Sequence, residues 1–166
     1  MRPPAPVWQD IRDLAGNKPW LVLFCLALII MITITMRASS AVYYFKYYLQ
    51  QPQLIGEFLS SYMLALALGA ASTPVLTRFF DKKTLMMGLM GLAGVLSLAL
   101  YFVPPDNISA VFALNLAIGF VLGPKSPLAF SMYADSADYN EWRTGRRATA
   151  MTFSAATFSQ KLGGAL

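Results

Sequence analysis

The sequence contains no histidine and only one cysteine, Cys25, which lies inside an apolar run. A single cysteine cannot form an internal disulfide, and the usual Cys/His sets that bind zinc are missing. A thiol in apolar surroundings is also a poor nucleophile. These absences argue against a Cys/His metal centre. They leave a membrane enzyme as the least favoured class, because neither a nucleophile–base pair nor paired membrane-depth carboxylates can be found.

Charge is scarce as well, since 13% of the 166 residues are charged and 57% are hydrophobic. This composition is typical of a polytopic membrane protein. A bilayer core about 30 Å thick needs about 20 apolar residues for each helix. We predict an all-α membrane bundle with five spans, at residues 20–43, 56–77, 84–103, 108–131 and 148–166. Residues 1–19 are interpreted as a cytoplasmic linker with a short amphipathic helix, and residues 132–147 as a cytoplasmic loop.

The few basic residues predict the orientation of these spans. Nine of them fall in the segment before the first span, between the second and third spans, and between the fourth and fifth, whereas the opposite side has only Lys46. Cytoplasmic loops are enriched in lysine and arginine, so the N-terminus should lie in the cytoplasm of a multi-pass protein of the cell's inner (plasma) membrane. The net charge of +5 is explained by this asymmetry and gives no reason to expect nucleic acid.

Lys161 lies at membrane depth in the fifth predicted span and shares a helical face with Ser154, Thr157 and Gly164. A charge at this depth costs about 2.5 to 3.5 kcal/mol on the insertion scale. Such a residue usually faces a cavity or a partner, so this polar face is a candidate functional site.

Arg37 is similar, because Thr33, Ser40 and Tyr44 share its face at spacings of four, three and seven residues. The alternative is an arginine that extends toward the outer headgroups, and both interpretations remain open. Lys125, between two prolines near the cytoplasmic end of the fourth span, fits the headgroup interpretation better. Asn115 could either bond across to another helix or line a cavity.

Three acids and three arginines occur within thirteen positions of the segment between the fourth and fifth spans. They are Asp135, Asp138, Glu141, Arg143, Arg146 and Arg147. From spacing alone this is an ordinary solvated loop, in which a surface ion pair contributes about 0 to 1 kcal/mol.

Three stretches resemble one known family. The stretch YADSADYNEWRTGRRATAMTFSAATFSQKLGGAL at residues 133–166 resembles the segment that joins the tenth and eleventh helices of the glycoside-pentoside-hexuronide:cation symporters. This major-facilitator family includes melibiose permease. The stretches DIRDLAGNKPWLVL and RFFDKK resemble the family's middle cytoplasmic loop and its loop between the eighth and ninth helices. The resemblance covers nearly the whole chain.

The resemblance implies helices seven to eleven of a C-terminal half, without the six-helix N-terminal bundle, the end of the eleventh helix and the twelfth. It implies uptake of a sugar or glycoside with Na⁺ or H⁺, and no other cofactor. Lys161 matches the family's lysine near the sugar and cation sites, and the charged segment would form ion pairs of a cytoplasmic gate. The family's cation-binding acids lie mainly on the first-half helices, so this chain alone should not transport.

The candidate cavity residues are therefore Lys161, Thr157, Ser154, Arg37, Thr33, Tyr44 and Asn115. Arg37 and Lys125 match no family motif, and an acidic sugar is one possible reason for their presence. The alternative function is a small membrane scaffold or assembly protein, in which Lys161 and Arg37 would tolerate apolar replacement.

Overall fold

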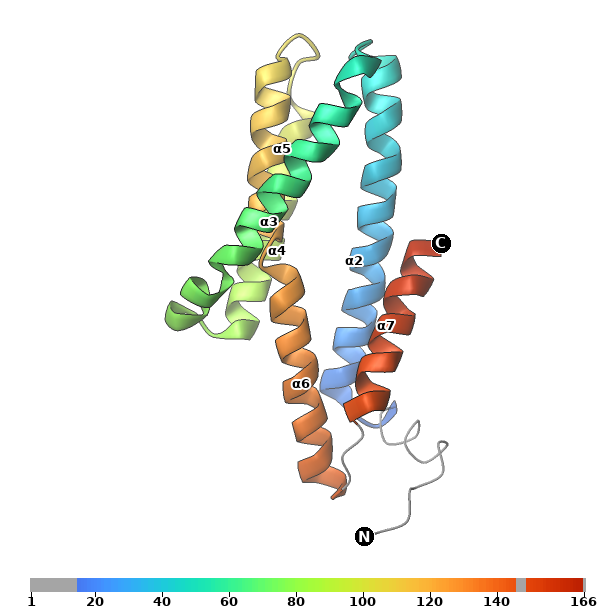
Figure 1. Cartoon of the computed structure of the whole chain (residues 1–166), viewed down its shortest axis with the longest axis vertical. Coiled ribbons are helices and arrows are strands. Elements are labelled where there is room, and N and C mark those ends of the chain that lie inside the picture. Colours follow the sequence, from blue (N-terminus) through green and yellow to red (C-terminus); the bar gives the residue numbers. More distant parts are fainter. Residues whose placement is uncertain (1–14, 146–148, 166) are drawn as a thin grey trace. The chain divides into compact units, whose positions relative to one another are not determined.

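The computed structural model describes residues 15–145 and 149–165. Its helices are α2 (Lys18–Tyr43), α3 (Ile55–Phe79), α4 (Lys82–Tyr101), α5 (Ile108–Leu122), α6 (Lys125–Thr144) and α7 (Thr149–Ala165) (Figure 1). A π-helical segment, Tyr44–Tyr48, continues α2, and a short 3₁₀ turn, Pro52–Leu54, precedes α3. The described ranges contain no strand, which confirms the all-α prediction. The predicted amphipathic helix before residue 15 lies outside these ranges.

Four helical stretches in the described ranges are long and apolar enough to cross a membrane. They are Lys18–Tyr48, Pro52–Phe79, Lys82–Tyr101 and Ile108–Arg143. Each overlaps one predicted span. The predicted fifth span coincides with α7, which has 17 residues, so its crossing of the membrane remains a prediction.

The chain divides into two compact units. The first comprises the described residues of 1–37 and 129–166, and the second comprises residues 38–128. Their cores differ in kind. In the second unit the rings of Phe45, Phe58 and Phe112 pack against one another, and in the first unit several hydrogen bonds join the helices.

In the second unit, α3 and α5 are in backbone contact. A Cβ atom added at Gly69 would lie 2.0 Å from the carbonyl oxygen of Phe120, and one added at Gly123 would lie 2.4 Å from the backbone nitrogen of Ala70. Small residues are enriched where membrane helices approach this closely. Toward the other end of the pair, the ring of Phe58 lies 4.7 Å from that of Phe45. The close contact of Gly123 with α3 fixes the end of α5, just before α6 begins.

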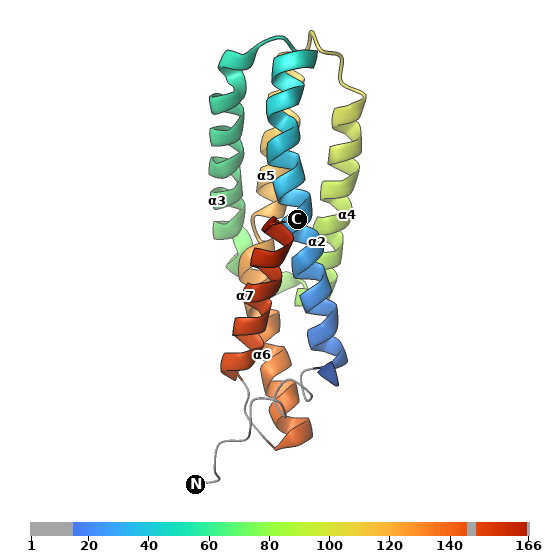
Figure 2. The ribbon, with the colours of Figure 1, turned by 90° about the vertical axis from the view of Figure 1, so that its right-hand side faces the viewer.

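In the first unit, the first half of α2 packs against α6 and α7. Leu23, Ala27, Tyr133 and Ala156 form the buried cluster. The Tyr133 hydroxyl donates to the carbonyl oxygen of Leu23 at 3.4 Å, which joins α6 to α2. Figures 1 and 2 show α7 alongside this part of α2.

The prediction of a loop at residues 132–147 is wrong for most of its length, because α6 continues to Thr144. The physical reason is a buried stripe formed by Tyr133, Ser136, Ala137 and Asn140. Their spacing of three, four and seven residues is the helical period. Packing of this stripe stabilises a helix despite the polar composition, and the charged side chains lie on the other side.

Candidate functional site

Helix α7 has two different faces. One face is buried and consists of Thr152, Ala156, Ser159 and Gly163. The other is exposed and contains the predicted polar residues Ser154, Thr157 and Lys161, followed by Gly164. The structure therefore brings together on one surface the group that the spacing predicted.

The buried face fixes α7 on α2 through contacts with the α2 backbone. The Ser159 hydroxyl donates to the carbonyl oxygen of Phe24 at 2.8 Å. A Cβ atom added at Gly163 would lie 2.6 Å from the carbonyl oxygen of Leu28, so glycine permits this close approach. At the start of α7, the indole nitrogen of Trp20 donates to the carbonyl oxygen of Thr152 at 3.5 Å. Together these contacts set the rotation of α7 and hence the direction of its polar face.

The exposed face carries an ammonium and two hydroxyl groups. The Thr157 hydroxyl donates to the carbonyl oxygen of Phe153 at 2.9 Å, within the same helix, and its oxygen can still accept a hydrogen bond. Lys161 lies one helical turn further along. Hydroxyl and ammonium groups on one surface can bind the hydroxyls of a sugar.

The remaining predicted cavity residues are divided between the two units. Thr33 and Arg37 belong to the first unit, where Thr33 is exposed and Arg37 half-buried. Tyr44 belongs to the second unit and lies in the π-helical segment, with its ring 5.2 Å from that of Tyr48. Short π-helical segments are frequent at functional sites. A common cavity for these three residues and Lys161 remains a prediction.

Asn115 had two possible roles, and the structure shows a bond between helices. Its side chain is fully buried, and its amide nitrogen donates to the carbonyl oxygen of Phe58 at 2.8 Å. This bond joins α5 to α3 inside the second unit. The assignment of Asn115 to an open cavity surface is therefore corrected, because an enclosed amide bonded to the backbone of α3 stabilises helix packing.

The predicted gate residues occupy the exposed side of α6. Asp135, Asp138 and Glu141 are all exposed. Arg143 donates to the carbonyl oxygen of Gly16, before the start of α2. Arg146 and Arg147 lie outside the described residues, so their ion pairs remain predictions. Within the described ranges, no three His, Cys, Asp or Glu side chains gather as a metal ion would require.

Sequence reasoning missed the buried polar stripe on α6. The Asn17 amide nitrogen donates to the Ser136 carbonyl oxygen at 3.2 Å, and the Asn17 side-chain oxygen accepts from the Trp20 backbone N–H at 3.2 Å. The first bond joins the second half of α6 to the start of α2, and the second satisfies a backbone N–H in the first turn of α2. The helical spacing of Tyr133, Ser136 and Asn140 was the signal that could have revealed the stripe.

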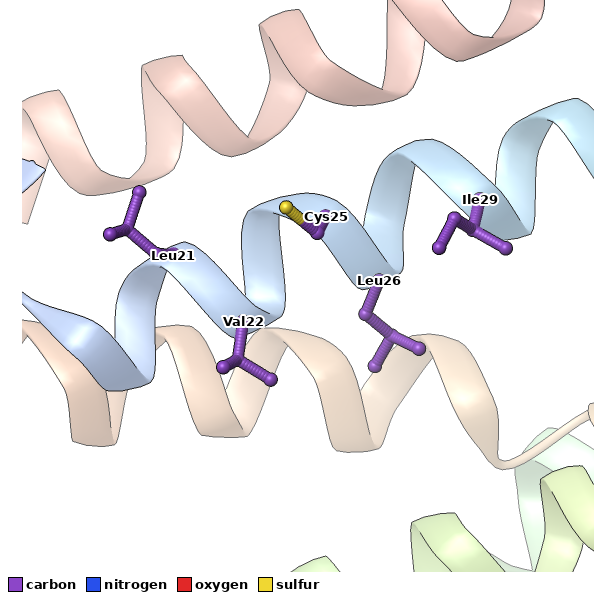
Figure 3. Close-up of a pocket in the computed structure, with 5 residues that line it drawn as sticks. All are labelled: Leu21, Val22, Cys25, Leu26 and Ile29. Carbon is purple, nitrogen blue, oxygen red and sulfur yellow. The ribbon is translucent and has the colours of Figure 1, made fainter.

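A depression of about 410 Å³ lies on the surface of α2 (Figure 3). Its lining is Leu21, Val22, Cys25, Leu26 and Ile29. These side chains offer no hydrogen-bonding oxygen or nitrogen to a sugar. The depression suits hydrocarbon chains better than a polar substrate, so the polar face of α7 remains the candidate site.

Comparison with known proteins gives consistent results. The family model described as MFS/sugar transport protein matches residues 1–166. YagG of Escherichia coli K12, provisionally named a glycoside/cation symporter, is 30% identical over 98% of this chain and 35% of its own length. The inner membrane symporter YicJ of the same organism is 30% identical over 93% of this chain and 34% of its own length.

The isoprimeverose transporter of Lactiplantibacillus pentosus is 32% identical over 95% of this chain and 33% of its own length. The chain thus spans about a third of the length of these relatives. No solved structure matches the chain.

Proposed function

We propose that this chain, which belongs to the family of MFS/sugar transport proteins, is part of a longer transporter. The longer protein would carry a sugar or glycoside together with a cation. In such transporters two helical bundles rock about a site near the middle of the membrane. This chain supplies helices of the second bundle, and a six-helix first bundle is its expected partner. The longer protein is called the intact transporter below.

The exposed polar face of α7 is the observation that carries the proposal. Lys161 is exposed on a helix whose opposite face is packed on α2. Because an uncompensated charge in lipid costs about 2.5 to 3.5 kcal/mol, this face should meet water, substrate or the partner bundle. We assign to this face of α7 the binding of the sugar and the path of the coupling Na⁺ or H⁺.

The acidic face of α6 is assigned to the cytoplasmic gate. Each of the outward-facing and inward-facing states needs contacts that the other state lacks. Asp135, Asp138 and Glu141, with the arginines that follow, can form ion pairs when the inner side is closed. Opening toward the cytoplasm would separate some of these pairs. This role requires α6 to end on the cytoplasmic side, as the distribution of basic residues predicts.

Cysteine substitution tests whether the α7 face contacts water and sugar. In the intact transporter with Cys25 changed to serine, Thr157→Cys should react with a membrane-impermeant methanethiosulfonate reagent, because Thr157 is exposed. Ala156→Cys is the matched control, since Ala156 is 2% exposed and packs toward α2. We expect fast labelling at position 157, slowed by added glycoside, and little labelling at position 156.

Two outcomes would contradict the assignment of this face. Equal labelling at both positions would mean that the two faces of α7 do not differ in contact with water. Fast labelling at position 157 that no glycoside slows would separate this face from the sugar site.

A further inference from the structure

Lys125 differs from every other basic residue in the described ranges because its side chain is buried. It is 6% exposed and is the first residue of α6. Sequence reasoning placed its charge at the headgroups, but the structure shows a buried side chain on a residue of the second unit. That interpretation is corrected.

No acidic side chain compensates for Lys125 inside the described part of the chain. Its six acidic residues, Glu57, Asp81, Asp106, Asp135, Asp138 and Glu141, are all exposed. Within the same ranges the ammonium group of Lys125 makes no hydrogen bond and no ion pair. An enclosed ammonium without a partner is costly. In membrane proteins such residues pair with each other, face a water-filled cavity or mark a substrate path.

The surroundings of Lys125 are those of an interrupted membrane helix. α5 ends at Leu122 and α6 begins at Lys125. Pro124 and Pro127 lack the N–H groups that a continuous helix would use. The N-terminus of a helix carries a partial positive charge and favours anions. In transporters, the N-termini of such half-helices point at the anionic groups of substrates.

We propose that Lys125 and the N-terminus of α6 bind an oxyanion carried by the transported sugar, such as a carboxylate or sulfonate. This inference rests on the proposed transport function and narrows its substrate class to acidic sugars. The charge of Lys125 and the partial positive charge of the helix N-terminus occur at the same residue. The described part of the chain supplies no buried acid to neutralise them. A lipid phosphate has the same chemistry, so its contribution must be tested separately.

A matched pair of sugars tests the proposal in the intact transporter. Uptake of methyl glucuronide and methyl glucoside is measured in proteoliposomes that contain no anionic lipid. Lys125→Met removes the charge and keeps a long flexible side chain, whereas Lys125→Arg keeps the charge. The control is Lys83→Met, since Lys83 is exposed in the first turn of α4.

We expect the methionine variant at position 125 to raise the half-saturating concentration of the glucuronide roughly ten-fold to a hundred-fold, the range for loss of a charged hydrogen bond. The glucoside should change by less than about two-fold, and this also shows that the variant folds. Lys125→Arg should retain most of the preference for the glucuronide over the glucoside. An equal loss for both sugars, or no change for either, would overturn the proposal.

A second measurement does not depend on transport. Acetylation of Lys125 in the wild-type protein is followed by mass spectrometry, with methyl glucuronide, methyl glucoside or phosphatidylglycerol vesicles added. Protection by the glucuronide alone supports the anion site, even if uptake of both sugars fails and the transport function with it. Protection by neither sugar, or by the anionic lipid alone, overturns the acidic-sugar assignment even if transport is observed.

Discussion

Replacing Lys161 by methionine in the intact transporter is expected to lower gradient-driven sugar uptake roughly ten-fold to a hundred-fold, the range for loss of a charged hydrogen bond. Lys161 is exposed on the polar face of α7, one turn beyond Thr157, whereas the opposite face contacts α2. The substitution should therefore remove a contact with substrate or with a carboxylate of the partner bundle and leave the packing of α7 unchanged. Methionine is unbranched and of similar length, so steric changes are small.

Uptake and the amount of folded protein are measured together for this variant. Lys83→Met is the matched control, because it removes one exposed lysine from another helix, α4, and should leave uptake unchanged. Loss of folded protein would indicate a structural role. Full uptake by Lys161→Met would remove Lys161 from the site and would favour the scaffold interpretation, which predicts tolerance of apolar replacement.

The two adjacent glycines of α7 should respond differently to alanine. Gly163→Ala places a Cβ atom 2.6 Å from the Leu28 carbonyl oxygen and 3.0 Å from the Met31 Cβ atom. Gly164→Ala meets only the Thr35 hydroxyl oxygen, at 4.0 Å. Overpacking costs about 1 to 3 kcal/mol, whereas alanine is favoured over glycine in a helix by up to about 1 kcal/mol. We expect Gly163→Ala to lower the thermal stability and Gly164→Ala to preserve or raise it.

Gly163→Ala should also lower uptake. Lys161 lies two residues before Gly163, so a shift of α7 on α2 displaces its side chain. Thermal unfolding and uptake of the two variants are compared in the same lipid. Equal stability of the two proteins would contradict the described packing of α7. A stable Gly163→Ala variant with full uptake would show that the α7–α2 contact does not position the site.

Much of the fold followed from the sequence, because apolar length and helical spacing are local properties. The four long apolar helices overlap the predicted spans, and Ser154, Thr157 and Lys161 lie on one exposed face as their spacing required. The quoted motifs also led to the correct family before any comparison. These features depend on periodicity and on contiguous residues.

The errors occurred where contacts between distant segments determine the structure. Residues 132–144 looked like a loop because they are polar, yet Tyr133 bonds to α2 and its stripe makes the segment helical. The burial of Lys125 likewise could not be read from its neighbours in sequence, where Ser126 and Pro127 are exposed. Asn115 was ambiguous until its bond to Phe58 on α3 was known. None of these partners is close in sequence.

Uptake of radiolabelled glycosides by the intact transporter in proteoliposomes tests the central claim most directly. A panel of neutral and acidic glycosides is compared with a Na⁺ gradient, with a proton gradient and with neither. The account predicts that at least one glycoside accumulates only when one of the two gradients is imposed, and that dissipating the gradient stops accumulation. Absence of accumulation for the whole panel under both gradients, in correctly folded protein, would contradict a cation-coupled sugar transporter.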